Sequence, residues 1–252
     1  MTVTYRRDDA IAWLTIERPE ALNVLSHDVR RGLFDGFARY ADDSAAAVLI
    51  LTGEGDRAFC AGGDLKEMAE DGLLVPPPDY VPQLGRNITV DKPVIAAVNG
   101  IAYGGGFMLV QNCDLAVAAE HARFAIAEAK VGRGAPWAVP LTRIVGRRIA
   151  AQLLMTGDPI DARRAYELGL VNEVVPACEL RAAAARLART IAGNAPLSVR
   201  AAKQTVLLDP ALALDDAFAA AERLWEPVYL SDDARNGPRA FAEKRTPQWK
   251  GH

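Results

Sequence analysis

The chain has 252 residues, half of them hydrophobic, and a formal net charge of −3 at pH 7. This balance leaves no basic surface for nucleic acid, and no apolar run approaches the roughly 20 residues of a membrane span. Three widely spaced cysteines and three isolated histidines predict free thiols and no metal site. Because the N-terminus also lacks a secretion signal, we expect a cytoplasmic protein with neither a nucleic-acid nor a membrane partner.

The N-terminal third shows clear strand and helix patterns. Residues 3–5 and 11–17 read as the two strands of a hairpin, and Ser26 is placed to cap the helix that follows. The largely apolar segment 48–53 reads as a buried strand. The apolar face predicted for the helix consists of Val29, Leu33, Phe37 and Tyr40.

A glycine loop follows the buried strand at 48–53. Gly62 and Gly63 precede Asp64, which is a suitable N-cap for a helix over 65–69, with Glu67 at the third helical position as in a capping box. Because Gly63 lies in this loop at the start of a helix, its backbone N–H is predicted to be available to a ligand.

Three prolines at 76–78 then separate two predicted helical pieces.

A second glycine loop repeats this arrangement. The apolar segment 92–98 reads as a buried strand, and helical periodicity resumes after the triplet Gly104, Gly105 and Gly106. Glycine lets a ligand approach the backbone, and the start of a helix favours a negative or polarised oxygen. If the two strands are neighbours in one sheet, the N–H groups of Gly63 and Gly105 can hold one carbonyl oxygen.

Both loops belong to a series of motifs that runs through roughly nine-tenths of the chain. In this order and spacing, the chain resembles the crotonase superfamily, also called the enoyl-CoA hydratase/isomerase family. The resemblance implies an α/β fold, with a spiral of ββα units over residues 1–175 and a helical trimerisation region over 176–252. It also implies an acyl-CoA thioester substrate, no separate cofactor, and a homotrimer or dimer of trimers. The motifs begin at residues 18, 58, 92, 113, 153, 169, 194 and 240.

The same resemblance assigns roles to particular residues. Gly63 and Gly105 match the family's oxyanion hole, whose two N–H groups bind the thioester oxygen. Ala61 and Asp64 fall among the substrate-binding positions. Cations for the CoA phosphates are expected at Arg18, Lys66, Lys244 and Arg245, and Lys244 matches a position that reaches CoA from a neighbouring subunit.

The acid–base residues depart from the typical hydratase pattern. Typical hydratases carry two glutamates, but here the first position is Met108 and only the second, Glu128, is a carboxylate. The apolar neighbours Phe124 and Ile126 predict a desolvated carboxyl that works near neutral pH. One glutamate can return a proton to a different carbon, so this pattern favours double-bond isomerisation or a specialised hydration.

The turn at 132–140 also differs, because it has no further carboxylate and offers Arg133 and Trp137 instead. Trp137 fits a wall against a flat acyl group as well as a packing anchor. Two other functions stay open: a thioester hydrolase in which Glu128 activates water, and a non-catalytic acyl-CoA-binding protein. A serine hydrolase does not fit, because residues 107–109 after the triplet are apolar.

Overall fold

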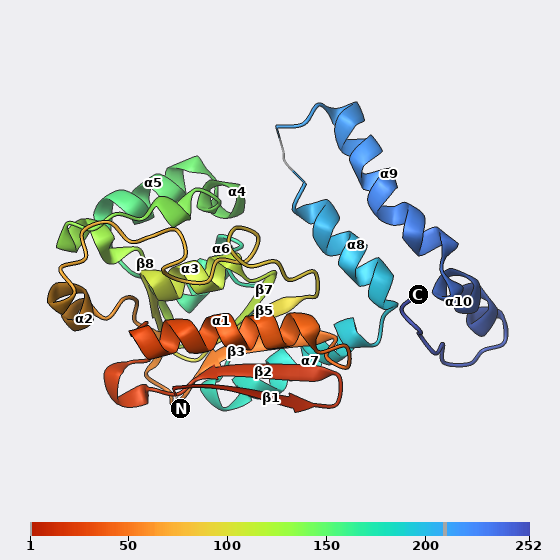
Figure 1. The fold of residues 1–252 in the computed structure, drawn as a ribbon, viewed down its shortest axis with the longest axis horizontal. Coiled ribbons are helices and arrows are strands. Elements are labelled where there is room, and N and C mark those ends of the chain that lie inside the picture. The colour runs from red at the N-terminus through yellow and green to blue at the C-terminus, as the bar shows by residue number, and fades with distance from the viewer. Residues whose placement is uncertain (1, 209–210) are drawn as a thin grey trace.

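The computed structural model describes residues 2–208 and 211–252, and its larger part is built on two sheets (Figure 1). The first sheet has the strand order β1-β2-β3-β5-β7-β10; β1 and β2 form the predicted antiparallel hairpin and the remaining pairs are parallel. The strands are β1 Val3–Asp8, β2 Ile11–Ile16, β3 Val48–Gly53, β5 Val94–Val98, β7 Leu115–Ala119 and β10 Glu173–Val175.

The second sheet is smaller and has the order β4-β6-β8-β9. Its first three strands are parallel, and each follows a strand of the large sheet along the chain. The chain therefore passes from the large sheet to the small sheet and then into a helix or helical turn, three times in succession. These strands are β4 Ala58–Cys60, β6 Ile101–Tyr103, β8 Arg123–Ala125 and β9 Ile160–Asp161.

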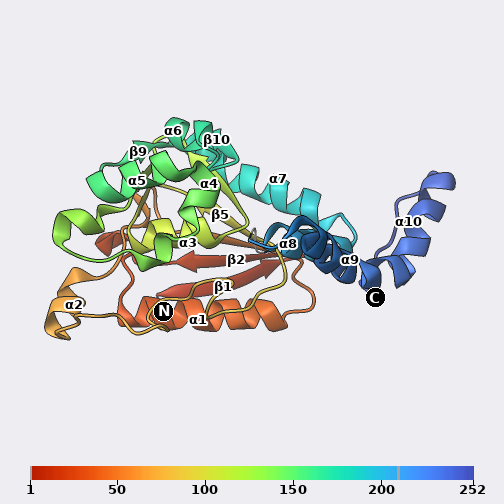
Figure 2. The same cartoon turned by 90° about the horizontal axis from the view of Figure 1, so that it is seen from above.

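The large sheet is covered by a helix on each face, which explains the apolar runs of β3 and β5. Leu49 and Leu51 share a core with helix α1 (His27–Asp42), whereas Val48 and Ile50 share a second core with α7 (Leu180–Ala192). Figure 2 shows the two helices on opposite sides of the strands. The predicted Ser26 cap and the apolar face of α1 are both confirmed.

Shorter helices and helical turns connect the strands, and three helices follow α7. The connecting helices are α2 Leu65–Glu70, α3 Gly105–Asn112, α4 Leu141–Val145, α5 Arg147–Thr156 and α6 Ala162–Glu167. The 3₁₀ turns are η1 Pro19–Ala21, η2 Ala127–Val131, η3 Pro136–Ala138 and η4 Ala177–Glu179. The last helices are α8 Pro196–Val206, α9 Leu214–Leu230 and α10 Asp232–Ala242.

The C-terminal helices extend away from the two sheets (Figure 1). The predicted division at 175/176 assigns α7 to this extension, yet Ala183, Ala184 and Ala188 of α7 are buried against the large sheet. We therefore propose that the boundary follows α7.

No helix among the residues described is long and apolar enough to cross a membrane.

Two local predictions are wrong. Residues 71–93 contain no second helix, since prolines at 76–78 and 82 remove backbone donors from this stretch. The strand at 94–98 does not lead directly into the glycine triplet either, because the chain first crosses to the small sheet and forms β6. The triplet still lies between a strand and a helix, as predicted.

Candidate active site

Three parallel strands of the small sheet end at one edge, and each is followed by a predicted functional residue. Gly63 follows β4, Gly105 follows β6 and Glu128 follows β8. Because β6 pairs with both β4 and β8, the carboxyl ends of these strands lie together. The condition set for joining the two glycine loops is also met, since the predicted strands at 48–53 and 92–98, β3 and β5, are neighbours in the large sheet.

The glycine turns pack closely against each other. Gly62 and Gly104 have φ angles of +102° and +52°, which favour glycine. A Cβ at Gly62 would lie 3.0 Å from the carbonyl oxygen of Tyr103, and one at Gly106 would lie 1.9 Å from that of Cys60. Residues with side chains would force these loops apart.

This packing leaves two backbone donors free. Among the described residues, no group accepts a hydrogen bond from the N–H of Gly63 or of Gly105. Gly105 is the first residue of α3, where N–H groups have no intrahelical partner and the helix dipole adds partial positive charge. Such donors suit an oxygen that becomes negative during a reaction.

The carboxyl group of Glu128 lies over the second glycine turn. A Cβ added to Gly104 would be 3.1 Å from its Oε1, and its Oε2 is buried without a hydrogen-bond partner among the described residues. Burial raises the pKa of Glu128, against smaller opposing effects of its own backbone N–H and of Trp137. The group is thus prepared to exchange protons closer to neutral pH than an exposed glutamate.

Met108 supplies no second carboxylate. It lies on α3, is 2% exposed and faces the same cavity as Glu128. Of the described residues lining this cavity, Glu128 alone is acidic. Proton transfer by side chains therefore depends on one carboxyl group.

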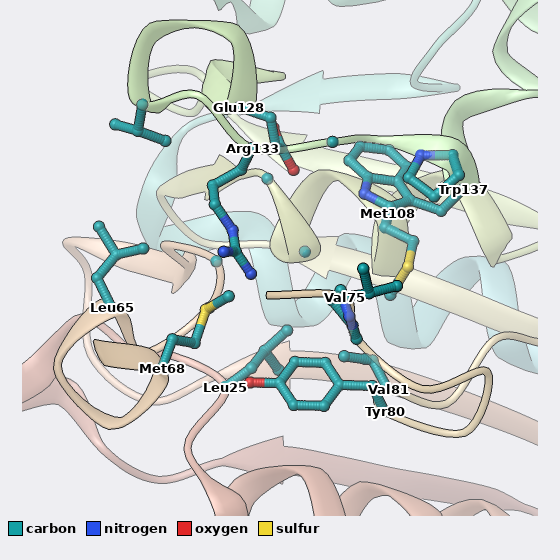
Figure 3. A pocket seen from close by; sticks show the side chains of 18 of the residues that line it. Leu25, Leu65, Met68, Val75, Tyr80, Val81, Met108, Glu128, Arg133 and Trp137 are labelled. Atoms are coloured by element: carbon teal, nitrogen blue, oxygen red, sulfur yellow. The ribbon is translucent and has the colours of Figure 1, made fainter. Parts of the chain in front are cut away.

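The cavity has a volume of about 620 Å³, within the range of ligand-binding pockets (Figure 3). One wall carries Glu128 and Arg133, and the facing wall includes Tyr80 and Val81 from the long loop 71–93. Further lining residues are Leu25, Ala61, Leu65, Met68, Val75, Pro76, Pro77, Pro78, Gln83, Arg86, Met108 and Trp137.

Comparison with known proteins identifies the family. The model for enoyl-CoA hydratase/isomerase matches residues 6–252. The chain belongs to this family. It is 37% identical to a carnitinyl-CoA dehydratase of Salmonella arizonae, over 98% of this chain and 97% of the relative. It is also 37% identical to a 2,3-dehydroadipyl-CoA hydratase of Escherichia coli, over 97% of both chains.

Solved structures agree with this assignment. The crystal structure of an enoyl-CoA hydratase from Mycobacterium marinum matches with a TM-score of 0.91 and 38% identity, over 100% of this chain and 99% of that one. The predicted family, its fold and its enzymatic nature are therefore confirmed. The relatives named above are hydratases and dehydratases, so of the two alternatives predicted from Met108, isomerisation or a specialised hydration, hydration is favoured.

Only some of the predicted substrate-binding residues of this hydratase/isomerase family member line the cavity. Ala61, Met108 and Trp137 do. The carboxylate of Asp64 instead accepts a hydrogen bond from Arg18 Nη1 at 2.9 Å and caps α2. Arg18 is thereby neutralised, which makes it a weaker candidate for a CoA phosphate.

Lys66 and Lys244 lie outside the cavity of their own chain. Lys66 is exposed on α2, and Lys244 follows α10, at the other end of the molecule from α2 (Figure 1). The predicted capping box is half wrong, since Glu67 Oε2 accepts a bond from the N–H of His27, 2.7 Å away, and not from Asp64. α2 is consequently tied to α1.

Two asparagines that received no role from the sequence position β4. Nδ2 of Asn23 and Nδ2 of Asn99 both donate to the carbonyl oxygen of Ala58, at 2.7 and 3.1 Å. Asn99 Oδ1 also accepts a bond from the N–H of Gly53 at 3.1 Å. Both residues lie within the sequence motifs, but their partners are 35 and 41 residues away, so no local pattern reveals the contacts.

Tyr80 and Arg133 are further cavity residues without an assigned role. The Tyr80 hydroxyl accepts a hydrogen bond from Arg30 Nη1 at 2.9 Å, and the Arg30 guanidinium lies 3.9 Å from the Tyr80 ring centre.

Within the described part of the chain, no group of three His, Cys, Asp or Glu side chains is arranged to hold a metal ion.

Proposed function

We propose that this enzyme catalyses the reversible hydration of a double bond conjugated to a CoA thioester, with Glu128 as its single acid–base residue. One observation carries the proposal: a desolvated carboxyl lies beside a turn that offers a free N–H, with a second free N–H on the adjacent turn. CoA is part of the substrate, and the reaction needs no further cofactor.

The mechanism follows from these groups. The Glu128 carboxylate accepts a proton from water while the water oxygen bonds to the β-carbon and the double-bond electrons move toward the thioester oxygen. The N–H groups of Gly63 and Gly105 bind the resulting enolate oxygen, each donor lowering the barrier by ~3 kcal/mol. Protonated Glu128 then delivers its proton to the α-carbon, which completes the addition of water.

Isomerisation is the second candidate because Met108 is buried and apolar where a second acid would assist water. In that reaction Glu128 takes a proton from carbon 2 of a 3-enoyl-CoA, which leaves a dienolate, and returns the proton to carbon 4, so that the double bond moves into conjugation with the thioester. The same oxyanion donors serve both reactions, so only the products distinguish them.

The deciding experiment incubates the purified protein with matched 2-enoyl-CoA and 3-enoyl-CoA substrates in deuterated water. Products are resolved by mass. We expect the 2-enoyl-CoA to gain the mass of water, with deuterium at the α-carbon. Label exchange and double-bond movement without water would establish isomerisation, and release of free CoA, measured with a thiol reagent, would establish a thioester hydrolase.

We also propose that the C-terminal helices form a homotrimer or a dimer of trimers. Apolar side chains on α9 and α10 are exposed in the single chain, including Phe218 at 61% and Phe241 at 88%. In such an assembly Lys244 would contact the CoA bound to a neighbour. Light scattering should give a trimer or hexamer mass for the wild type and a smaller mass for Phe218→Asp.

A further inference from the structure

Arg133 places a positive charge in the wall of the cavity. It lies just after η2, and Figure 3 shows its side chain pointing into the cavity, on the same wall as Glu128. Nη1 donates to the carbonyl oxygen of Leu73 at 2.9 Å, while Nη2 is buried and has no hydrogen-bond partner among the described residues. A guanidinium has five N–H donors, so most of this one's capacity is unused.

No carboxylate of the described residues neutralises Arg133. Arg133 forms no ion pair with the described residues. Burial raises the pKa of Tyr80, and the charge of Arg133 opposes this increase by a smaller amount. The carboxylate of Asp71, near the start of the loop 71–93, pairs instead with His27 at 2.7 Å. Arg133 is half-buried, but its Nη2 is buried with neither a hydrogen-bond partner nor a counter-charge among the described residues, which favours a site that an anion completes.

The charge of the whole cavity points the same way. Its described lining residues include two guanidinium groups, Arg86 and Arg133, and one carboxyl group, Glu128. The cavity therefore keeps a net positive charge even when Glu128 is ionised. Apart from these groups the walls are mainly apolar, so an anion that enters must be carried on a largely apolar ligand.

Arg133 is poorly placed for the phosphates of CoA. Its backbone N–H donates to the carbonyl oxygen of Glu128 at 2.9 Å, so the two residues lie within one turn of each other. Glu128 must meet the acyl carbons beside the thioester, whereas the phosphates lie a full pantetheine arm away. In the proposed reaction, the guanidinium, which lies on the same wall as Glu128, is therefore closer to the acyl group than to the phosphates.

We infer that the preferred acyl group carries its own carboxylate, which pairs with Arg133. The planar guanidinium suits such a group because it binds both carboxylate oxygens at once. The Tyr80 hydroxyl, which accepts a bond from Arg30, keeps its proton to donate on the facing wall. This inference deepens the proposed function, since it names the substrate class of the same cavity.

Binding of non-reacting ligands tests the inference apart from any turnover. Calorimetry compares adipyl-CoA with hexanoyl-CoA, which differ in a terminal carboxylate against a methyl group. The wild type should bind adipyl-CoA roughly 10- to 100-fold more tightly, as expected for a charge-assisted pair. Arg133→Met should abolish this preference and leave hexanoyl-CoA affinity within about threefold, and Arg133→Lys should restore part of it.

Arg148→Met is the matched control, because it removes an exposed arginine of α5 outside the cavity. It should keep the wild-type preference. The inference is overturned if the wild type binds hexanoyl-CoA as tightly as adipyl-CoA, a result that needs no variant to fold. Equal loss of both ligands in Arg133→Met would overturn it too, by assigning Arg133 to CoA or to the loop at Leu73. Failure of hydration with the carboxylate preference intact would instead count against the proposed function alone.

Discussion

Replacing Glu128 by Gln should remove nearly all turnover while leaving substrate binding intact. General acid–base groups typically contribute a factor of about 10² to 10⁴. We expect the upper half of that range, ~4 to 5.5 kcal/mol of barrier, because no other described residue lining the cavity is acidic. Gln matches Glu in shape, and Oε2 has no hydrogen-bond partner to lose, so the cavity should keep its form.

The assay is steady-state hydration of a 2-enoyl-CoA across a pH series, with binding of the saturated acyl-CoA measured in parallel. The wild-type rate should fall with decreasing pH earlier than for an ordinary carboxyl, because burial raises the pKa of Glu128 and the carboxylate is the active form. Glu120→Gln, an exposed glutamate, is the control. Turnover of Glu128→Gln within tenfold of wild type would refute the single-carboxylate reasoning.

Three other substitutions probe the surrounding site. Met108→Glu adds a second carboxylate to the cavity and should raise 2-enoyl-CoA hydration roughly tenfold or more, with a new limb in the pH–rate profile; a loss of rate would show that the apolar residue serves the reaction. Gly105→Val should lower activity and acyl-CoA binding together, since its Cβ would lie 2.5 Å from Cδ1 of Leu25 and 3.9 Å from the Cα of Gly62, and its methyl groups would crowd the approach to the backbone N–H. Gly106→Ala should lower the free energy of unfolding by about 3 kcal/mol or more in chemical denaturation, since its Cβ meets the backbone oxygen of Cys60 at 1.9 Å. Wild-type stability of Gly106→Ala would contradict the close packing of α3 on β4.

Burial of Glu128 also predicts that Glu128→Gln raises the stability of the fold, although the same substitution lowers activity. A raised folded-state pKa means that ionising this carboxyl costs folding energy above its unfolded pKa, and that the cost disappears as the pH falls below it. Glu128→Gln should therefore gain thermal stability over the wild type at alkaline pH and lose that gain under acidic conditions. An unchanged difference in Tm across the pH series would argue against a desolvated carboxyl.

Long elements with regular patterns were predictable from the sequence. Ser26 and the apolar face after it define α1, and the apolar runs of β3 and β5 mark strands covered on both sides. The glycine loops and Glu128 were found by motif and spacing. The pairing of β3 with β5 was stated as a condition for their meeting and is present, but the sheet edge at which they meet belongs to β4, β6 and β8, which were not predicted.

Short elements and distant contacts were not predictable in the same way. β4, β6 and β8 have three residues each, too few for a hydrophobic period, so the crossing between sheets was missed. Alanine-rich α7 was assigned to the C-terminal region because alanine faces look alike whether they pack on a sheet or on another subunit. The sequence also did not reveal that Asp64 is buried in an ion pair with Arg18, because the two residues are 46 positions apart.

The division of labour between the small sheet and the loop 71–93 has a consequence for how such an enzyme diversifies. The reacting groups stand on strand ends locked by pairing, whereas the opposite wall is a segment without helix or strand, apart from an isolated bridge between Leu84 and Ile88. We therefore expect substitutions in that segment to change which substrates enter the cavity. The reacting groups on the strand ends should be unaffected. Transplanting the loop between relatives is thus a direct route to new selectivity, and mutational tolerance should be high there and low at the glycine turns.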